Sequence, residues 1–396
     1  MGRTGVLLLP WIVAALALAL VIAWLASKDP LHRPAHATLS VRAAMSVEES
    51  AGYLRADGPH EFSFPADHAA HDGFKTEWWY FTGNLETTAG RRFGYQLTFF
   101  RSALTPRRVE RASTFAAEHV WMAHFALSDI EGQHFHSFER FARESGGIAG
   151  ATMLPVSVWL RDWRCDFSAA GLPLRVVAVQ DGISIDLSLD SKKAPVLQGE
   201  NGLSRKNARA GNASYYYSLT RLETSGWIRL GGSKFDVRGT SWMDREWMTS
   251  ELESEQIGWE WFALQLDDGS ELTWYRLRRK DGSDDPFNAG SFVDKVGSRM
   301  PLRAKDVDIV EDKSWTSPRT KAVYPAHWLL RIQSLGVDLE VTPALADQEL
   351  DSSFKYWEGA VDVSGTRAGR KLQGRGYVEL VGYAKLNSSD ALGAMR

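Results

Sequence analysis

The sequence predicts an all-β protein with two domains. After residue 60 the chain continues for about 335 residues, which is more than one hydrophobic core usually supports. It contains 16 tryptophans and 34 glycines, and large flat rings with frequent turn residues suit sheets better than a helical bundle. Between residues 62 and 250 the sequence has no long apolar stripe with the period of a helix. We therefore expect sheets in both domains.

The clearest strand pair lies near the start of the first domain. Residues 77–83 form an aromatic run, a polar turn follows at residues 86–91, and residues 93–100 form a second aromatic run. This pattern predicts a β-hairpin. Further strands are expected at residues 121–128, 183–189, 214–222, 227–230 and 235–242.

A loose internal repeat supports the division into two domains. Residues 260–264 resemble residues 77–81, and they are followed by a polar turn at 267–270 and an aromatic return strand at 272–277. In both copies a glutamate, Glu77 or Glu260, begins a strand of large aromatic residues. We expect domains at residues 61–247 and 248–390, with their junction near residues 245–258.

The N-terminus predicts attachment to a membrane. Residues 5–26 carry no charge, and 22 residues are enough for one helix to cross a hydrocarbon core that needs about 20. Signal-peptide cores are usually shorter, at about 7–15 residues. Residues 1–27 are therefore predicted to be a transmembrane signal anchor, with a signal peptide as the alternative, and residues 28–60 a linker. We expect a single-pass protein of the cell membrane whose soluble domains face the periplasm or exterior.

Composition and missing motifs narrow the function. A net charge of -3 gives no basic field for nucleic acid, and a single cysteine, Cys165, allows no intrachain disulfide. The sequence has no Gly-rich phosphate loop, nucleophile elbow or Cys–His pair, so we expect neither nucleotide chemistry nor a cofactor. His119 with His124, and His134 with His136, lack an evident third metal ligand. We expect no metal site, and His124 is predicted to be a hydrogen-bonded core histidine or part of a pocket.

Several longer motifs occur in a fixed order. They are residues 75–83 (KTEWWYFTG), 121–129 (WMAHFALSD), 213–218 (ASYYYS), 241–247 (SWMDREW), 356–359 (YWEG) and 374–380 (GRGYVEL). In these motifs the chain resembles the AttH-like and carotenoid 1,2-hydratase-like group, also called lipocalin-like hydratases, from His71 to Tyr383. The resemblance implies two consecutive lipocalin-like barrels with an apolar cavity in or between them. It also implies an apolar ligand of isoprenoid or lipid type.

The strand that begins at Glu77 has two bulky faces. In an extended chain Glu77 and Trp79 share one face, and Trp78 and Tyr80 share the other. We expect one face to lie toward a cavity and the other toward a neighbouring layer. In one interpretation this motif closes the barrel end and Glu77 pairs with an arginine, because buried carboxylates are usually paired. In the other, Glu77 faces the pocket as an acid.

Residues 241–247 are the best candidate for chemistry. If this segment is extended, Trp242, Asp244 and Glu246 share a face and the two carboxylates lie roughly 6–7 Å apart. Hydrating an isolated double bond begins with protonation to a carbocation. That step needs a carboxylic acid kept neutral by burial or by a second carboxylate, and aromatic faces that stabilise the cation. In the alternative interpretation both carboxylates hydrogen-bond backbone amides at the domain junction, and Arg245 keeps a neighbouring carboxylate charged.

Two classes of function stay open. One is a hydratase that adds water to a C=C bond of an apolar substrate. The other is a non-catalytic extracytoplasmic carrier of a lipid-like ligand that serves an ABC-type export system, a partnership that the resemblance implies. The resemblance also implies a histidine and an aspartate in the hydratase branch. Asp244 matches the aspartate motif but its neighbour is Arg245, a departure that weighs against hydratase activity.

The candidate residues follow from these patterns. The expected catalytic residues are Asp244, Glu246 and Glu77. The expected ligand-binding residues are Trp78, Trp79, Tyr80, His124, Trp242, Trp259 and Trp261. Asp244 is expected to line an apolar pocket together with Trp242 and a ring from residues 77–80, and to donate a proton from a carboxyl whose pKa is raised by burial.

Overall fold

The computed structural model describes residues 51–106, 118–250 and 252–384. Within these ranges the regular structure is β-sheet with short 3-10 helices at Ala66–His68, Ser145–Gly147, Ala304–Asp306 and Gln333–Leu335. The prediction of an all-β protein is confirmed. The helix predicted at residues 1–27 and most of the linker predicted at 28–60 lie outside the described residues. In the described part of the chain, no helix has the length and apolar character needed to cross a membrane.

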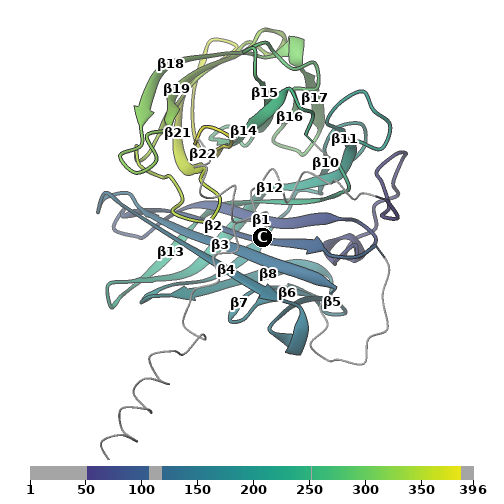
Figure 1. Ribbon diagram of the computed structural model, residues 1–396. Helices are drawn as coiled ribbons and strands as arrows, with labels where there is room; N and C mark the ends of the chain where they lie inside the picture. Colours follow the sequence, from purple (N-terminus) through teal and green to yellow (C-terminus); the bar gives the residue numbers. More distant parts are fainter. Residues whose placement is uncertain (1–50, 107–117, 251, 385–396) are drawn as a thin grey trace, which may run out of the picture. The chain divides into compact units, whose positions relative to one another are not determined.

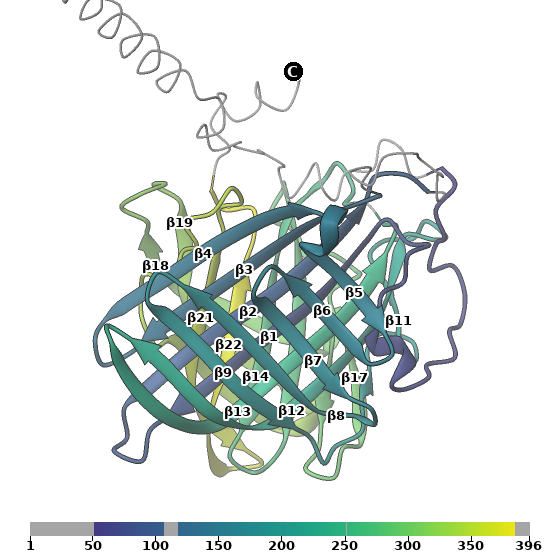
Figure 2. The same ribbon diagram turned by 90° about the horizontal axis from the view of Figure 1, so that it is seen from below.

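The first sheet contains 13 antiparallel strands in the described ranges (Figures 1 and 2). Its order is β4-β3-β2-β1-β13-β12-β9-β8-β7-β6-β5, and β10 and β11 also pair with β12. The strands are β1 (Thr76–Glu86), β2 (Arg92–Ala103), β3 (His119–Asp129), β4 (His134–Arg143), β5 (Ala149–Met153), β6 (Val156–Leu160), β7 (Trp163–Ser168), β8 (Gly171–Gln180), β9 (Ile183–Asp190), β10 (Val196–Leu197), β11 (Leu203–Arg205), β12 (Ala213–Leu230) and β13 (Ser233–Met248).

The second sheet contains nine antiparallel strands in the order β17-β16-β15-β14-β22-β21-β20-β19-β18, again counted over the described residues. They are β14 (Gln256–Leu266), β15 (Glu271–Arg279), β16 (Ala289–Val293), β17 (Arg299–Arg303), β18 (Asp308–Thr316), β19 (Val323–Ile332), β20 (Val337–Pro343), β21 (Trp357–Arg367) and β22 (Arg370–Leu380). In each sheet the strand that comes first along the chain pairs with the strand that comes last along the chain. These pairs are β1 with β13 and β14 with β22. The two sheets form two consecutive lipocalin-like barrels.

Each of the two hairpins that resemble each other in sequence contains an ion pair between its strands. Glu77 on β1 lies opposite Arg101 on β2, and Glu260 on β14 lies opposite Arg276 on β15. Each arginine pairs with its glutamate, and both glutamates are fully buried. The glutamate that begins each aromatic strand is therefore neutralised by the return strand of its own hairpin.

One strand is longer than the sequence predicted. Separate strands were expected at residues 214–222 and 227–230, but β12 runs unbroken from Ala213 to Leu230. The polar stretch between them pairs with β9 on one side and β13 on the other, so its backbone stays in the ladder. Gly226 lets β9 approach closely, because a Cβ there would lie 2.1 Å from the carbonyl oxygen of Asp186.

Apolar side chains form a core inside each sheet and a third cluster between the sheets. The first core includes Trp79, Trp121 and Trp163, and the second includes Trp328 and Trp357. The cluster between the sheets contains Tyr80, Trp242, Trp261, Ala263, Tyr275, Leu277, Ala360 and Tyr377. The strands that supply it are therefore covered on both faces, as predicted for the strand that begins at Glu77.

Polar contacts also join the two sheets. Glu271 on β15 is fully buried and accepts from Arg221 on β12 at 2.5 Å and from Lys193 at 2.7 Å. Asn84 on β1 donates to the carbonyl oxygen of Gly376 on β22 at 3.1 Å. These polar contacts fix the outer face of the first sheet against the second.

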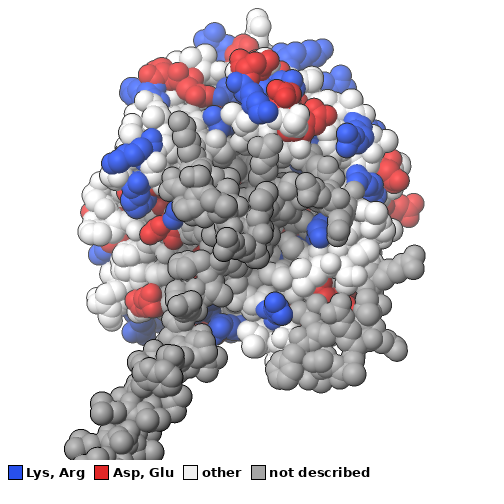
Figure 3. Space-filling view, in the orientation of Figure 1, with Lys and Arg blue, Asp and Glu red and all other residues white. Residues whose placement is uncertain are grey.

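On the surface of the molecule, basic and acidic side chains are interspersed over the face shown in Figure 3.

Candidate functional site

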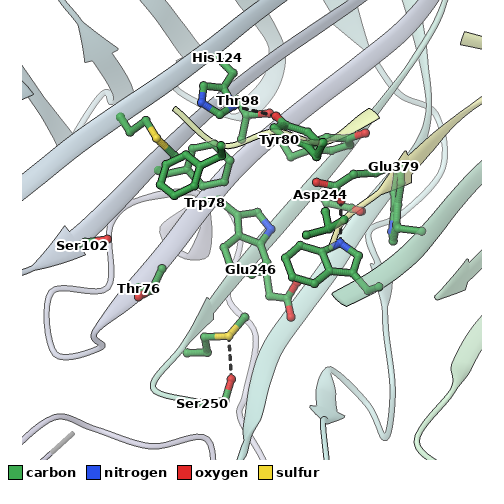
Figure 4. A pocket seen from close by; sticks show the side chains of 18 of the residues that line it. Thr76, Trp78, Tyr80, Thr98, Ser102, His124, Asp244, Glu246, Ser250 and Glu379 are labelled. Carbon is green, nitrogen blue, oxygen red and sulfur yellow. Dashed lines mark hydrogen bonds between the residues drawn. The ribbon is translucent and has the colours of Figure 1, made fainter. Parts of the chain in front are cut away.

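A cavity of about 270 Å³ lies between the two sheets (Figure 4). Its volume is near the lower end of the usual range for small-molecule pockets, about 300–1,000 Å³. One wall comes from β1, β2, β3, β4, β12 and β13, and the other from β14, β15, β21 and β22. Alternate residues reach it: Trp78 and Tyr80 line the cavity, whereas Trp79 lies in the first core.

The walls are rich in aromatic and apolar side chains. The rings that line the cavity are Trp78, Tyr80, Phe100, Phe141, Tyr216, Trp259, Trp261, Tyr275, Phe354 and Tyr356. Tyr80 meets Trp261 edge to face with ring centres 5.0 Å apart, so the two walls touch through their rings. A molecule bound here would contact mainly aromatic and apolar side chains.

Asp244 is a buried carboxyl on the wall formed by the first sheet. It lies on β13, opposite Tyr80 on β1 and Ser218 on β12. Ser218 donates to Oδ1 at 2.5 Å, Tyr216 to Oδ2 at 2.7 Å and the indole of Trp242 to Oδ1 at 2.7 Å. Burial raises the pKa of Asp244 to about 7 despite these three donors, which favour the charged form. Asp244 therefore titrates near neutral pH.

Glu246 lies two residues further along β13 and has a cationic partner. Lys206 lies 2.8 Å from its Oε1, which also accepts from the hydroxyl of Ser214. The ammonium of Lys206 lies 4.9 Å from the centre of the Tyr275 ring. This ion pair adds little net charge to the cavity.

Glu379 faces the cavity from the second sheet. It lies on β22 and accepts a hydrogen bond from the indole of Trp259 at 2.9 Å. Burial, together with the charges of Asp244 and Glu246, raises the pKa of Glu379 to about 7, although the hydrogen bond from Trp259 favours the charged form. Its side chain keeps part of its surface accessible. A second carboxyl that titrates near neutral pH thus stands on the wall opposite Asp244.

Glu358 also lines the cavity and lies on β21, directly opposite Glu379 in the ladder. Burial raises the pKa of Glu358 well above its usual value, and the charge of Glu379 raises it further. The hydroxyls of Tyr80 and Tyr356 approach it and oppose this shift, but neither carboxyl oxygen makes a well-formed hydrogen bond within the described ranges. The environment of Glu358 therefore favours its neutral form.

His124 on β3 lines the cavity through a fixed imidazole. Its Nδ1 lies 2.7 Å from the hydroxyl of Tyr356 and its Nε2 lies 3.1 Å from Glu139. The Tyr356 contact joins β3 to the chain just before β21, and the Glu139 contact joins β3 to β4. His124 is both a hydrogen-bonded core histidine and a residue of the pocket.

Glu77 and Trp79, two of the expected site residues, lie on the other face of β1 and are not among the residues that line the cavity. Glu77 pairs with Arg101 and Arg245 and accepts from the backbone nitrogen of His71 at 3.0 Å. Burial acts to raise the pKa of Glu77, but the two guanidinium groups outweigh it and hold the pKa well below its usual range. Glu77 is a charged partner inside the first barrel, which is the first of the two roles considered from the sequence.

Arg245 lies on the opposite face of β13 from Asp244. Its guanidinium carbon lies 3.8 Å from the centre of a Trp79 ring, and it pairs with Glu77. Trp242 does not itself line the cavity but donates to Asp244 and packs edge to face with Trp261. Sequence adjacency therefore does not make Arg245 the partner of Asp244.

Four polar groups of the site were not named from the sequence: Lys206, Tyr216, Glu358 and Glu379. The signal for Glu379 is a carboxylate within the apolar run Tyr377-Val378-Glu379-Leu380, and Glu358 directly follows Trp357. Both lie in motifs that carry the family resemblance. In the described ranges, no cluster of three or more His, Cys, Asp or Glu residues is suited to a metal ion.

The fold and the cavity define a lipocalin-like protein with an apolar cavity between two barrels. The chain belongs to the AttH-like family, whose sequence profile matches residues 55–383. The crystal structure of a putative AttH from Nitrosomonas europaea is similar, with 36% identity and a TM-score of 0.74, over 82% of this chain and 98% of that one. The match to carotenoid 1,2-hydratases in particular stays a prediction.

Kievitone hydratases are also similar to this chain. That of Fusarium solani subsp. phaseoli is 26% identical over 220 residues, which are 52% of this chain and 59% of that protein's length. The crystal structure of kievitone hydratase from Nectria haematococca is 15% identical, with a TM-score of 0.64, over 84% of this chain and 96% of that one. The structural likeness at this identity concerns the fold alone.

Proposed function

We propose that this protein binds an apolar small molecule, of isoprenoid or lipid type, between its two sheets and adds water to a C=C bond of that molecule. The observation that carries the proposal is Asp244: a carboxyl with a pKa of about 7 on the wall of an aromatic cavity. The similarity to a kievitone hydratase over half of the chain supports the same reaction class.

The reaction needs two proton transfers. A proton from a neutral carboxyl forms the new C–H bond with the π electrons of the alkene, which leaves a carbocation and a carboxylate. Water then forms a C–O bond to the cation and gives up a proton to a carboxylate. The balance is alkene plus water to alcohol, with no redox change, and the carboxyl groups are restored by exchange with solvent.

The cavity suits the cationic intermediate. Aromatic faces attract a cation, and the rings of Trp78, Trp259 and Trp261 stand on the cavity walls. Exclusion of bulk water strengthens every electrostatic contact in the site. A single ordered water, held by a carboxyl, is then the nucleophile.

The experiment follows heavy oxygen from labelled water. Purified protein is incubated with kievitone, or with a simple isoprenoid alkene, in water labelled with oxygen-18. The mass of the product is then measured by mass spectrometry. We expect one labelled hydroxyl per product and a loss of about 10²–10⁴-fold in Asp244→Asn, with binding retained. Glu223→Gln, at an exposed ion pair with Lys192, is the matched control. Unlabelled substrate throughout, or full activity of Asp244→Asn, contradicts the proposal.

A second candidate is a carrier without catalysis. It is favoured by the three hydrogen bonds to Asp244, because the protein itself supplies the partners of this carboxyl. A carrier would bind the same probes tightly and leave every one unlabelled. The predicted N-terminal anchor and the ABC-type partner belong to this candidate, which would pass a lipid-like ligand to an exporter.

A further inference from the structure

We propose that Glu379 is the proton donor of the reaction, acting from the second sheet, and that Asp244 is the base that takes the proton of the attacking water from the first sheet. This inference rests on the proposed hydration and refines the expectation that Asp244 donates. It gives each barrel one of the two acid–base residues. A substrate would lie between them.

The two carboxyls are joined through the tryptophans of β14. Trp261 lies directly opposite Glu379 in the ladder, and its indole donates to the hydroxyl of Tyr216 at 3.2 Å. Tyr216 in turn donates to Asp244. Trp259, two residues before Trp261, donates to Glu379 itself. One strand therefore positions both carboxyls, and Figure 4 shows Asp244 and Glu379 in the same part of the cavity.

The number of donors separates the two roles. Asp244 accepts three hydrogen bonds, and donors to a carboxylate favour its charged form. Glu379 accepts a hydrogen bond from Trp259 and stands beside another acid, Glu358. A buried carboxyl with fewer donors is less able to carry a charge, and the charges of Asp244 and Glu246 also disfavour ionisation of Glu379. The proton is therefore held on Glu379, while Asp244 is the better acceptor.

The other charged groups around the pair agree with this assignment. Glu246 on β13 is neutralised by Lys206, and the positive charge of Lys206 lies on the side of Asp244. On the side of Glu379 stand Glu358 from β21 and the hydroxyl of Tyr80 from β1, whose pKa burial raises well above its usual value. Positive charge thus favours ionised Asp244, whereas the neighbour of Glu379 in the ladder is itself an acid.

Both carboxyls titrate where the reaction needs them. Burial raises the pKa of each to about 7, and the charge of Asp244 raises that of Glu379. Two coupled carboxyls share a proton over this pH range, so one acid and one base are present together. In the reaction Glu379 loses its proton to the alkene carbon and Asp244 gains one from water. Solvent then returns the pair to its starting state.

The first test uses kievitone in deuterium oxide. If Glu379 donates, Asp244→Asn still protonates the alkene reversibly and introduces deuterium into unreacted substrate, while hydration falls by about 10²–10⁴-fold. Glu379→Gln loses both deuterium exchange and hydration. Glu340→Gln, at an exposed glutamate of the same sheet, keeps both. Hydration by Glu379→Gln at the wild-type rate, or exchange that survives in Glu379→Gln and vanishes in Asp244→Asn, overturns the assignment.

A second measurement needs no substrate and separates failure of this inference from failure of the proposed function. The infrared carbonyl band of protonated carboxyls is followed from about pH 5 to 9 in wild type and variants, a range that brackets both titrations. We expect Glu379→Gln to remove one titrating band and to shift the remaining one, from Asp244, to lower pH. If wild type leaves kievitone unlabelled but this coupling is seen, the reaction is wrong and the pair stands. A spectrum that Glu379→Gln leaves unchanged overturns the pair.

Discussion

Glu77 and Asp244 lie on opposite faces of the β1–β13 pair, and the net shifts of their pKa values have opposite directions. Both are buried, so burial alone raises the pKa of each. Glu77 has two guanidinium groups in contact, whereas the hydrogen bonds to Asp244 come from neutral donors. The type of partner, rather than the depth of burial, decides which carboxyl stays charged and which can exchange a proton at neutral pH.

The first prediction concerns Glu77. Glu77→Gln keeps the shape of the side chain but leaves Arg101 and Arg245 buried without a counter-charge, so we expect a loss of about 3–5 kcal/mol in the free energy of unfolding. Because the folded pKa of Glu77 is depressed, this stabilisation is present above its unfolded pKa and is lost as the pH falls through the folded one. Denaturant titration at neutral pH measures it.

The control for that experiment is an exposed ion pair. Glu223 pairs with Lys192, and the side chain of Glu223 is 67% exposed. We expect Glu223→Gln to change the free energy of unfolding by less than about 1 kcal/mol. Equal losses in the two variants would show that the Glu77 network contributes no more than a surface pair.

The second prediction concerns the pH dependence of Asp244. Its folded pKa is about 7 against an ordinary value of 3.8, so the folded protein holds the proton more tightly and loses stability as the pH rises between these values. Asp244→Asn cannot titrate. Relative to this variant, wild type should lose up to about 4 kcal/mol between about pH 4 and pH 8, since one pKa unit equals about 1.4 kcal/mol. A pH-independent difference between the two unfolding curves contradicts the raised pKa.

At the scale of the element, β14 connects the two walls of the cavity. Trp259 holds Glu379, while Trp261 holds Tyr216, which in turn holds Asp244. Trp259→Phe keeps an aromatic ring and removes only the indole donor that favours ionised Glu379. We expect the pKa of Glu379 to rise above its value of about 7. Carbon-13 resonances of labelled glutamate follow this titration.

The matched variant is Trp315→Phe, because Trp315 packs against the second core and lies outside the residues that line the cavity. It should leave the Glu379 titration where it is. A Glu379 pKa that stays constant in Trp259→Phe would show that this hydrogen bond does not hold the charge.

The close approach of β2 to the second sheet gives another prediction. A Cβ on Gly94 would lie 2.5 Å from the hydroxyl of Tyr377 and 2.9 Å from Cβ of Ala360. We expect Gly94→Ala to cost about 1–3 kcal/mol of stability through overpacking between the sheets. Gly58→Ala, where a Cβ meets nothing within 4 Å, should change stability little. Equal unfolding midpoints for the two variants would mean that the sheets do not meet as described.

The sequence predicts strands well where the side chains alternate between two faces and a polar turn separates the strands. The aromatic hairpin at residues 77–100 has alternating faces and a polar turn, and β1 and β2 match it closely. It did not work for β12, because polar residues that resemble a turn can remain extended when strands pair with them on both sides. Local sequence does not report such pairing.

At the scale of the whole molecule, the site is a product of tertiary structure. Residues near in sequence, such as Asp244 and Glu246, were predictable from the alternation of a single strand. Glu379 and Tyr216 were not, because their roles depend on which strands of the two sheets face each other. Arg245 illustrates the opposite case, in which adjacency in sequence does not bring side chains together. It follows Asp244 in the chain, but its side chain points into the first barrel.

The central claim is that an apolar molecule binds between the two sheets, and a cavity-filling substitution tests it most directly. Met122 lines the cavity on β3, and Met153 is 58% exposed at the end of β5. The neutral dye N-phenylnaphthylamine is titrated into wild type, Met122→Trp and Met153→Trp, and its fluorescence is followed. We predict one saturable site in wild type and Met153→Trp, with at least about tenfold weaker binding in Met122→Trp. Equal binding by Met122→Trp and wild type would contradict the account.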